Sequence, residues 1–311
     1  PSQGGILVDL SQMSRITELS TDFWFVTVEP GVTFLQLKQA LDKAGMRMMA
    51  PLLTPPSASV LVTYLEREPV PQAADFVYGV DQVQDFRMVL PTGETFTVGN
   101  PALPGMPHTA PFGPGVNWWR MFMCAQGTMG ICYEMNLRLV SQPKAHKLFF
   151  SAFDHVSEVT EAIKHIQRQE LGFECFALNN FDLATMVVDE APLDTKSLKN
   201  GTYIGRMGAK PWSIAQRQRF EALRQALPPW TLILTLVGFT RHPEEKVAYQ
   251  ELDLRDLAAQ AGFDLLPSVG GITGLDKIVA DELLLPWRMQ KRFGYRGSCH
   301  GLMFYALAGN I

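Results

Sequence analysis

The sequence predicts a two-domain α+β protein, and three observations support this prediction. The chain has 311 residues, of which 47% are hydrophobic and 19% charged, which is enough to bury more than one core. Beyond residue 144, apolar strand-like runs alternate with amphipathic helical stretches, a pattern typical of a sheet with helices packed on one side. Gln142-Pro143-Lys144 interrupts the chain between these regions. We therefore expect domains at residues 1–143 and 144–311.

Composition excludes several classes of function. The net charge is −4 without a basic cluster, which argues against nucleic-acid binding. No run of about 18 apolar residues is present, so the sequence predicts no membrane span. The four cysteines form no Cys-x-x-Cys pair and have no histidine at metal-ligand spacing, so we expect neither a metal site nor a disulfide framework. The expected compartment is the cytoplasm, with the periplasm as the alternative.

The first element of domain 1 is predicted as a buried strand at Ile6–Leu10, and a second strand follows at Phe23–Val28. Thr33 is suited to be the N-cap of a helix, and Gly45 to end it. The apolar residues of this helix fall on one face: Phe34, Leu37, Ala40, Leu41 and Ala44.

The remainder of domain 1 contains proline-rich loops and one hairpin. Three prolines within residues 51–59 exclude regular structure there, and residues 100–115 form a second irregular loop. Asp85–Leu90 and Glu94–Val98 are predicted to pair as a hairpin. The methionines at positions 46, 48 and 49 are interpreted as core residues, with a partner-binding surface as the alternative.

Domain 2 is predicted as a series of strands, each followed by a helix. The expected strands are Leu148–Phe153, Phe173–Leu178, Thr202–Met207 and Thr231–Thr240. The expected helices are Val156–Gln169, a segment within Asp182–Val188, Ser213–Leu227 and Pro243–Ala261.

The most informative stretch is the turn Gln126-Gly127-Thr128-Met129-Gly130, which leads into the β-prone run Ile131–Val140. Two glycines three residues apart allow a tight turn and a close approach of backbone to a ligand. Free amide N–H groups in such a turn hold an anion or a ribose. The alternative is a turn that only positions the following strand.

Three segments in this order resemble the flavoprotein family of vanillyl-alcohol oxidase and 4-cresol dehydrogenase. They are Ile6–Ile16 (ILVDLSQMSRI), Val28–Phe34 (VEPGVTF) and the turn at 126–130 with the strand after it. The resemblance covers residues 5–143 and is looser afterwards. It implies an incomplete FAD-binding domain of the p-cresol methylhydroxylase type, followed by a cap domain in which helices cover an antiparallel sheet. It also implies FAD as cofactor and an oligomeric assembly.

The resemblance also implies which residues contact the cofactor. The turn would lie against the adenosine half of FAD, and Glu66-Arg67 correspond to the pair that faces the flavin ring. The corner Glu29-Pro30-Gly31 is interpreted mainly as structural, with cofactor contact as the alternative. The complete set of candidate cofactor-binding residues is Glu29, Pro30, Gly31, Glu66, Arg67, Gln126, Gly127, Thr128, Gly130 and Ile131.

Some positions depart from the family pattern. Val62 and Glu68 stand where the family has glycine, and the loop between Phe122 and Gln126 is shortened. A branched side chain in place of glycine keeps a flavin ring at a greater distance. The sequence therefore leaves open that FAD is weakly bound or lost.

The looser second half supplies the candidate catalytic residues His300, Arg296 and Tyr295, with Arg292 nearby. A histidine titrates near neutral pH and can act as a base, and cations lower the pKa of a phenol. The resemblance implies oxidation of para-substituted phenols by hydride transfer from the benzylic carbon to flavin N5, with a cytochrome c or dioxygen as electron acceptor. The alternative is a shortened, non-catalytic subunit that assembles with an intact flavoprotein. A binding module without redox chemistry is the third hypothesis.

Overall fold

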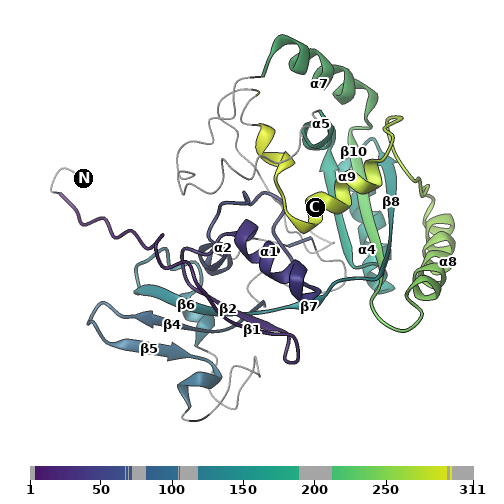
Figure 1. Ribbon diagram of the computed structural model, residues 1–311. Coiled ribbons are helices and arrows are strands. Elements are labelled where there is room, and N and C mark those ends of the chain that lie inside the picture. Colours follow the sequence, from purple (N-terminus) through teal and green to yellow (C-terminus); the bar gives the residue numbers. More distant parts are fainter. Residues whose placement is uncertain are drawn as a thin grey trace. The chain divides into compact units, whose positions relative to one another are not determined.

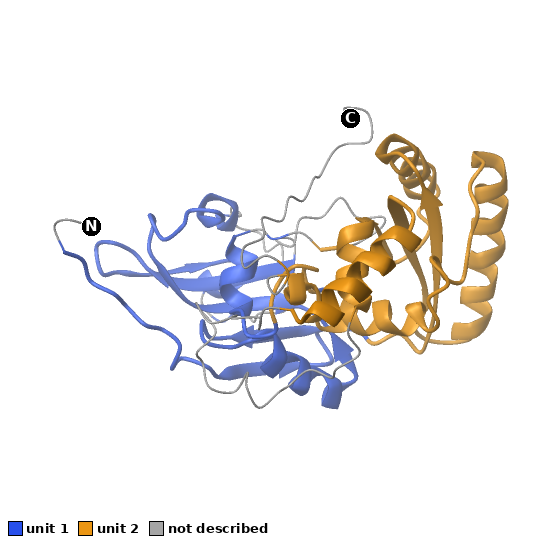
Figure 2. Cartoon of the chain, turned by 90° about the horizontal axis from the view of Figure 1, so that it is seen from above, with its two compact units in different colours: residues 1–49, 56–69, 78–141 blue, residues 50–55, 70–77, 142–311 orange. Residues whose placement is uncertain are grey.

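A computed structural model describes residues 4–66, 68, 70–71, 82–103, 105, 118–188, 212–292 and 295. These residues form two compact units (Figure 2), each with its own antiparallel sheet. Unit 1 takes its residues from 1–49, 56–69 and 78–141, and unit 2 from 50–55, 70–77 and 142–311. The α+β fold class is confirmed.

Unit 1 is built on a five-stranded sheet with the order β1-β2-β6-β4-β5 (Figure 1). Its strands are β1 (Ile16–Ser20), β2 (Phe25–Val28), β6 (Ile131–Arg138), β4 (Val83–Val89) and β5 (Thr95–Val98). The predicted hairpin is present as β4 and β5, and the amide of Gly93 donates to the carbonyl of Leu90 in its turn. β3 (Met46–Arg47) and β7 (Val140–Ser141) pair in a separate two-stranded antiparallel sheet.

The first helix of unit 1, α1 (Phe34–Ala44), has the predicted ends. The Thr33 side chain accepts from the amide of Gln36, and Gly45 adopts a left-handed conformation with φ 67°. This geometry satisfies amide groups that a helix end otherwise leaves unpaired. Shorter helices follow as α2 (Val60–Leu65), η2 (Asn100–Ala102) and α3 (Trp119–Phe122). The three methionines at 46, 48 and 49 are buried, which confirms their core interpretation.

The predicted strand at Ile6–Leu10 is wrong. These residues are extended but outside any sheet, and the side chains of Ile6, Leu7 and Val8 are 95%, 95% and 55% exposed. A strand requires a neighbour that accepts and donates main-chain hydrogen bonds, and the described part of the chain supplies none to this segment.

Unit 2 contains a three-stranded sheet with the order β8-β10-β9. Its strands are β8 (Ala145–Phe153), β10 (Trp230–Gly238) and β9 (Glu174–Asn179). The helices are α4 (Val156–Arg168), α5 (Asn180–Val187), α7 (Ile214–Ala226), α8 (Pro243–Ala261) and α9 (Leu275–Leu284), followed by the short η3 (Arg288–Lys291). Four of the predicted helices and three of the predicted strands are thus present. The strand predicted at Thr202–Met207 lies outside the described residues.

Helices cover both faces of this sheet, whereas the sequence pattern predicted one covered face. Phe149 of β8 packs in a cluster with residues of α4 and α8, and the next residue, Phe150, packs in a second cluster with residues of α5, α7 and α9. Consecutive strand residues point to opposite faces. Every residue of β10 after Trp230 is buried, so neither face of this strand meets solvent.

Within the described ranges, no helix is long and apolar enough to cross a membrane.

Candidate functional site

The turn between α3 and β6 exposes polar backbone. Gln126 and Gly127 have positive φ values of 49° and 76°, and both residues are exposed. The Thr128 amide and hydroxyl donate to the carbonyl of Ala125, over 3.0 Å and 2.6 Å. Among the described residues, nothing accepts from the amides of Gln126, Gly127 and Met129. These amides are therefore available to an acceptor from outside, such as a phosphate or a ribose oxygen.

The two glycines of this turn have different roles. A Cβ atom at Gly127 would meet no atom within 4 Å, so this position is open. A Cβ atom at Gly130 would lie 2.5 Å from the Val89 carbonyl oxygen and 2.5 Å from the Met88 Cε, so Gly130 allows β6 to pack on β4. Gly127 thus leaves room for a ligand, and Gly130 fixes the strand.

Cys124 joins this turn to the end of α2. Its amide donates to the Leu65 carbonyl over 2.9 Å, and its thiol lies 3.5 Å from the Glu66 carbonyl oxygen. Two segments that the sequence singled out separately, Glu66 and 126–130, therefore lie side by side. We call Glu66, Cys124 and residues 126–130 the α2 rim. Val62 of α2 is 50% exposed, and Ile131, which follows the rim, is 43% exposed. Arg67 lies outside the described residues.

The Glu29 side chain is engaged within unit 1. It is 4% exposed and accepts from the amide of Arg15 over 2.8 Å and from its guanidinium over 2.7 Å and 3.0 Å. The two carboxylate oxygens thus hold the start of β1 against the end of β2. Sequence reasoning missed Arg15 as the partner because thirteen residues separate the two side chains.

Pro30 and Gly31 complete this corner. The hydroxyl of Ser59 donates to the Pro30 carbonyl over 2.5 Å, and the amide of Gly31 donates to the Met13 carbonyl over 2.6 Å. A Cβ atom at Gly31 would lie 2.3 Å from the carbonyl oxygen of Ser11. These contacts give the corner a structural role. Its predicted contact with a cofactor stays a prediction.

Arg15 also determines how Glu29 responds to pH. The hydrogen bonds from Arg15 hold the pKa of Glu29 below its ordinary value of 4.5. A depressed pKa contributes stability that is present above pH 4.5 and is lost as the pH falls through the folded-state pKa. We expect Glu29→Gln to lower the thermal unfolding midpoint at pH 7, and this difference from wild type to narrow below pH 4.5. Glu18→Gln, at an exposed position on β1, is the control and should show neither effect. A Glu29→Gln difference that is constant across this range would contradict the expectation.

Asn100 is a buried polar residue that the sequence placed only in a loop. It is 2% exposed, and within the described ranges neither atom of its carboxamide has a hydrogen-bond partner. Gly99 holds it against β4, because a Cβ atom at Gly99 would lie 2.6 Å from the Cβ of Asp85. Burial without a partner costs about 1–3 kcal/mol, so this position is suited to a further partner. The turn-like Gly-Asn-Pro sequence gives no signal of it.

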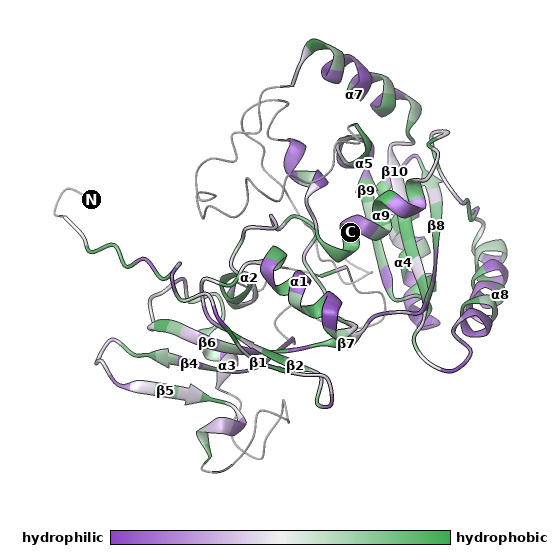
Figure 3. Cartoon of the chain, viewed as in Figure 1, coloured by the Kyte–Doolittle hydropathy of each residue, from purple (hydrophilic) through white to green (hydrophobic). Residues whose placement is uncertain are grey.

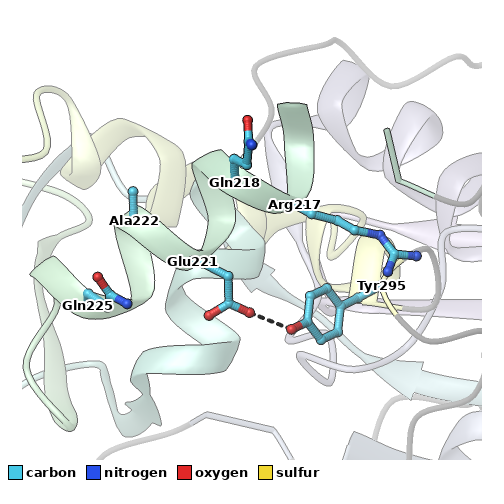
Figure 4. A pocket seen from close by; sticks show the side chains of 6 residues that line it. All are labelled: Arg217, Gln218, Glu221, Ala222, Gln225 and Tyr295. Atoms are coloured by element: carbon cyan, nitrogen blue, oxygen red, sulfur yellow. Dashed lines mark hydrogen bonds between the residues drawn. The ribbon is translucent and has the colours of Figure 1, made fainter. Parts of the chain in front are cut away.

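In unit 2, Tyr295 borders an open pocket of about 420 Å³ along α7 (Figure 4). Its hydroxyl donates to the carboxylate of Glu221, and the guanidinium of Arg217 lies 5.9 Å from the centre of its ring. The ring also packs edge-on against Phe181 and Trp212. The hydroxyl and ring of Tyr295 are thus held by unit 2 itself. The other two predicted catalytic residues, His300 and Arg296, lie outside the described residues.

Arg292 is buried in unit 2 and influences Asp182 at the start of α5. Burial raises the pKa of Asp182, and the positive charge of Arg292 opposes this increase. Among the described residues, no three side chains of His, Cys, Asp or Glu lie close enough together to hold a metal ion.

Comparisons with known proteins identify the type of fold. Residues 1–99 match a protein family described as "FAD binding domain". The 1'-carboxy-chondrochloren decarboxylase of Chondromyces crocatus is 27% identical over 195 residues, which are 60% of this chain and 35% of that protein. The flavoprotein subunit of 4-cresol dehydrogenase (hydroxylating) from Pseudomonas putida is 23% identical over 178 residues, 52% of this chain and 31% of that protein.

Among solved structures, substrate-bound p-cresol methylhydroxylase superimposes with a TM-score of 0.67 and 18% identity. The match covers 93% of this chain and 54% of that chain. This chain therefore spans about a third of the curated relatives it matches and about half of the solved structure. The resemblance to the vanillyl-alcohol oxidase and 4-cresol dehydrogenase flavoproteins is confirmed, and so is FAD as the cofactor of this type of domain.

Proposed function

We propose that this chain, whose residues 1–99 match an FAD-binding domain, is a flavoprotein-type oxidoreductase chain that takes part in the oxidation of para-substituted phenols. The α2 rim is the observation that supports this proposal most directly. Its amides at positions 126, 127 and 129 are open, and Gly127 leaves space above them. The resemblance implies that the adenosine half of FAD would lie at this turn, and amide N–H groups without an acceptor suit its ribose and phosphate oxygens.

In the proposed reaction, FAD supplies the hydride acceptor for the benzylic carbon of the phenol. The chain's own residues would bind and orient. The α2 rim would hold the cofactor through its backbone, with the end of α2 fixed to the turn by Cys124. Arg296 and Tyr295 are proposed to orient the phenol, where a positive charge favours the phenolate form. His300 is proposed to act as a base. A cytochrome c or dioxygen is the proposed electron acceptor, and a second flavoprotein subunit is a further proposed partner in an oligomeric assembly.

The runner-up is a shortened, flavin-poor subunit of the same fold that assembles with an intact flavoprotein. The half-exposed side chain of Val62 favours this alternative, because the resemblance implies a glycine there beside the flavin. A branched side chain limits how closely a flat ring approaches the helix.

Titration with FAD tests the proposal. We expect the purified chain, alone or in its natural assembly, to take up FAD and show bound-flavin absorbance. Gly127→Ala should weaken this binding about tenfold, which corresponds to about 1.4 kcal/mol, because the added methyl group covers the open amides.

Gly262→Ala is the matched control. Gly262 has a φ of 77°, close to the 76° of Gly127, and a Cβ there also meets nothing within 4 Å. It ends α8 in unit 2. If Gly262→Ala introduces the same backbone strain but leaves FAD binding unchanged, the weaker binding of Gly127→Ala arises at the α2 rim. Equal losses in both variants would contradict the rim, and no uptake at saturating FAD would favour the runner-up.

A further inference from the structure

The pocket along α7 has the size of a small-molecule site. Its volume is about 420 Å³, within the range of about 300–1,000 Å³ that is typical of ligand pockets. α7 carries both hydrophilic and hydrophobic residues (Figure 3), and Phe220 is the residue that it buries in the core of unit 2. The residues that line the pocket are Arg217, Gln218, Glu221, Ala222, Gln225 and Tyr295.

Five of these lining residues form one stripe along α7. Arg217, Glu221 and Gln225 follow one another at intervals of four residues, so their side chains share one side of the helix. Tyr295 faces this stripe from a later segment of unit 2 (Figure 4). The pocket thus has a wall of long polar side chains and an aromatic wall.

Glu221 is engaged at both of its carboxylate oxygens. Oε1 accepts a hydrogen bond from the hydroxyl of Tyr295, and Oε2 lies 3.1 Å from the guanidinium of Arg224. The first contact holds the ring of Tyr295 against the pocket. In the second, the positive charge of Arg224 offsets the negative charge of Glu221.

Arg217 supplies a positive charge at the pocket. Its guanidinium lies 5.9 Å from the centre of the Tyr295 ring, and Figure 4 shows its side chain extending towards that ring. Within the described part of the chain, no carboxylate pairs with this guanidinium. A guanidinium binds a planar carboxylate through two parallel hydrogen bonds. The pocket therefore favours an anion over a neutral ligand or a cation.

We propose that the pocket along α7 binds a small aromatic carboxylate. Arg217 would pair with the carboxylate, and the ring of Tyr295 would contact the edge of the ligand's ring. The carboxamides of Gln218 and Gln225 would hydrogen-bond polar substituents. Because Arg217 is exposed and exposed ion pairs are weak, the dissociation constant is expected near about 1 mM. The proposal does not depend on FAD binding or on phenol oxidation by this chain.

Methyl NMR tests the proposal at the pocket itself. The full chain is produced with ¹³C-labelled alanine methyl groups, and 4-fluorobenzoate is the probe. The control probe is 4-fluorobenzamide, which has nearly the same shape without the charge. We expect the methyl signal of Ala222, which lines the pocket, to shift saturably with 4-fluorobenzoate. The affinity for 4-fluorobenzamide should be about tenfold lower.

A pair of variants separates the pocket from the general charge of the helix. Arg217→Gln should remove the preference for the carboxylate, so that the two probes bind equally. Arg219→Gln removes the same charge from the same helix at a position that does not line the pocket, and should leave both affinities unchanged. Circular dichroism verifies that both variants are folded.

Three outcomes would overturn the proposal. They are no saturable shift of the Ala222 signal, equal affinities of the wild type for the two probes, and equal losses of affinity in Arg217→Gln and Arg219→Gln. Failure of FAD uptake would leave the proposal intact, because the probes are titrated without FAD.

Discussion

Gly31→Ala is expected to destabilise unit 1 by about 3 kcal/mol or more. The added Cβ would lie 2.3 Å from the Ser11 carbonyl oxygen and 2.8 Å from that of Met13. Both are backbone atoms, so no change of rotamer relieves the clash, and overpacking of this kind costs about 1–3 kcal/mol even where neighbours can adjust. The hydrogen bond from Gly31 to Met13 would be strained as well. Chemical denaturation followed by tryptophan fluorescence measures the loss.

Gly45→Ala is the control for this variant. Gly45 ends α1 with a φ of 67°, and a Cβ there meets nothing within 4 Å. Its substitution should cost only about 1 kcal/mol, from the strain of a positive φ. Equal losses for Gly31→Ala and Gly45→Ala would show that the packing of the Glu29-Pro30-Gly31 corner does not limit stability.

Glu282→Ala is expected to destabilise unit 2 by about 3 kcal/mol. The carboxylate of Glu282 is fully buried at the end of α9 and accepts from the amides of Arg288 and Met289, both over 3.0 Å. Removal of the carboxylate leaves these amides without an acceptor, at about 1–3 kcal/mol for each buried group. Circular dichroism during thermal and urea unfolding measures the effect.

The neighbouring carboxylate provides the matched control. Asp281 is 55% exposed and pairs with the same arginine, Arg288, over 2.6 Å. Exposed pairs contribute about 0–1 kcal/mol, so Asp281→Ala should cost less than 1 kcal/mol. If both variants lose the same stability, the ion pair with Arg288, and not the buried backbone bonds, holds this segment.

The effect of Glu282 should also depend on pH. Burial raises the pKa of Glu282 above its ordinary 4.5, although the backbone hydrogen bonds oppose this increase. A raised carboxyl pKa contributes stability that is full below pH 4.5 and declines as the pH rises through the folded-state value. The loss caused by Glu282→Ala should therefore be larger at pH 4.5 than at pH 8.

Local signals predicted local structure well. Thr33 and Gly45 define α1 because capping depends on residues within one turn of the helix end. Pro243–Ala261 is a helix with the predicted bounds for the same reason. The strand predicted at Ile6–Leu10 was wrong, because an apolar pattern indicates that a segment can be buried in a sheet but not which strand it pairs with.

The candidate site was only partly predictable. The sequence identified Glu66 and 126–130, but the contact that joins them runs through Cys124, fifty-eight residues from Glu66. Outside the candidate site, the structural role of Glu282 was not predicted, since its partners are amides in the segment after α9 and leave no side-chain signature. The second covered face of the unit 2 sheet was missed because the apolar face of a helix does not show which side of a sheet it covers, and α9 was not predicted.

The two hydrophobic layers of unit 2 lie on opposite faces of the same strand, β10. β10 contributes Leu232 and Leu234 to the layer under α4 and α8, and Ile233 to the layer under α5, α7 and α9. A displacement of this strand on one side is passed to the other, because interiors packed at this density have little free volume to absorb it. The substitutions that the layer under α4 and α8 can accept are therefore limited by the residues in the layer under α5, α7 and α9. The two layers are expected to change together.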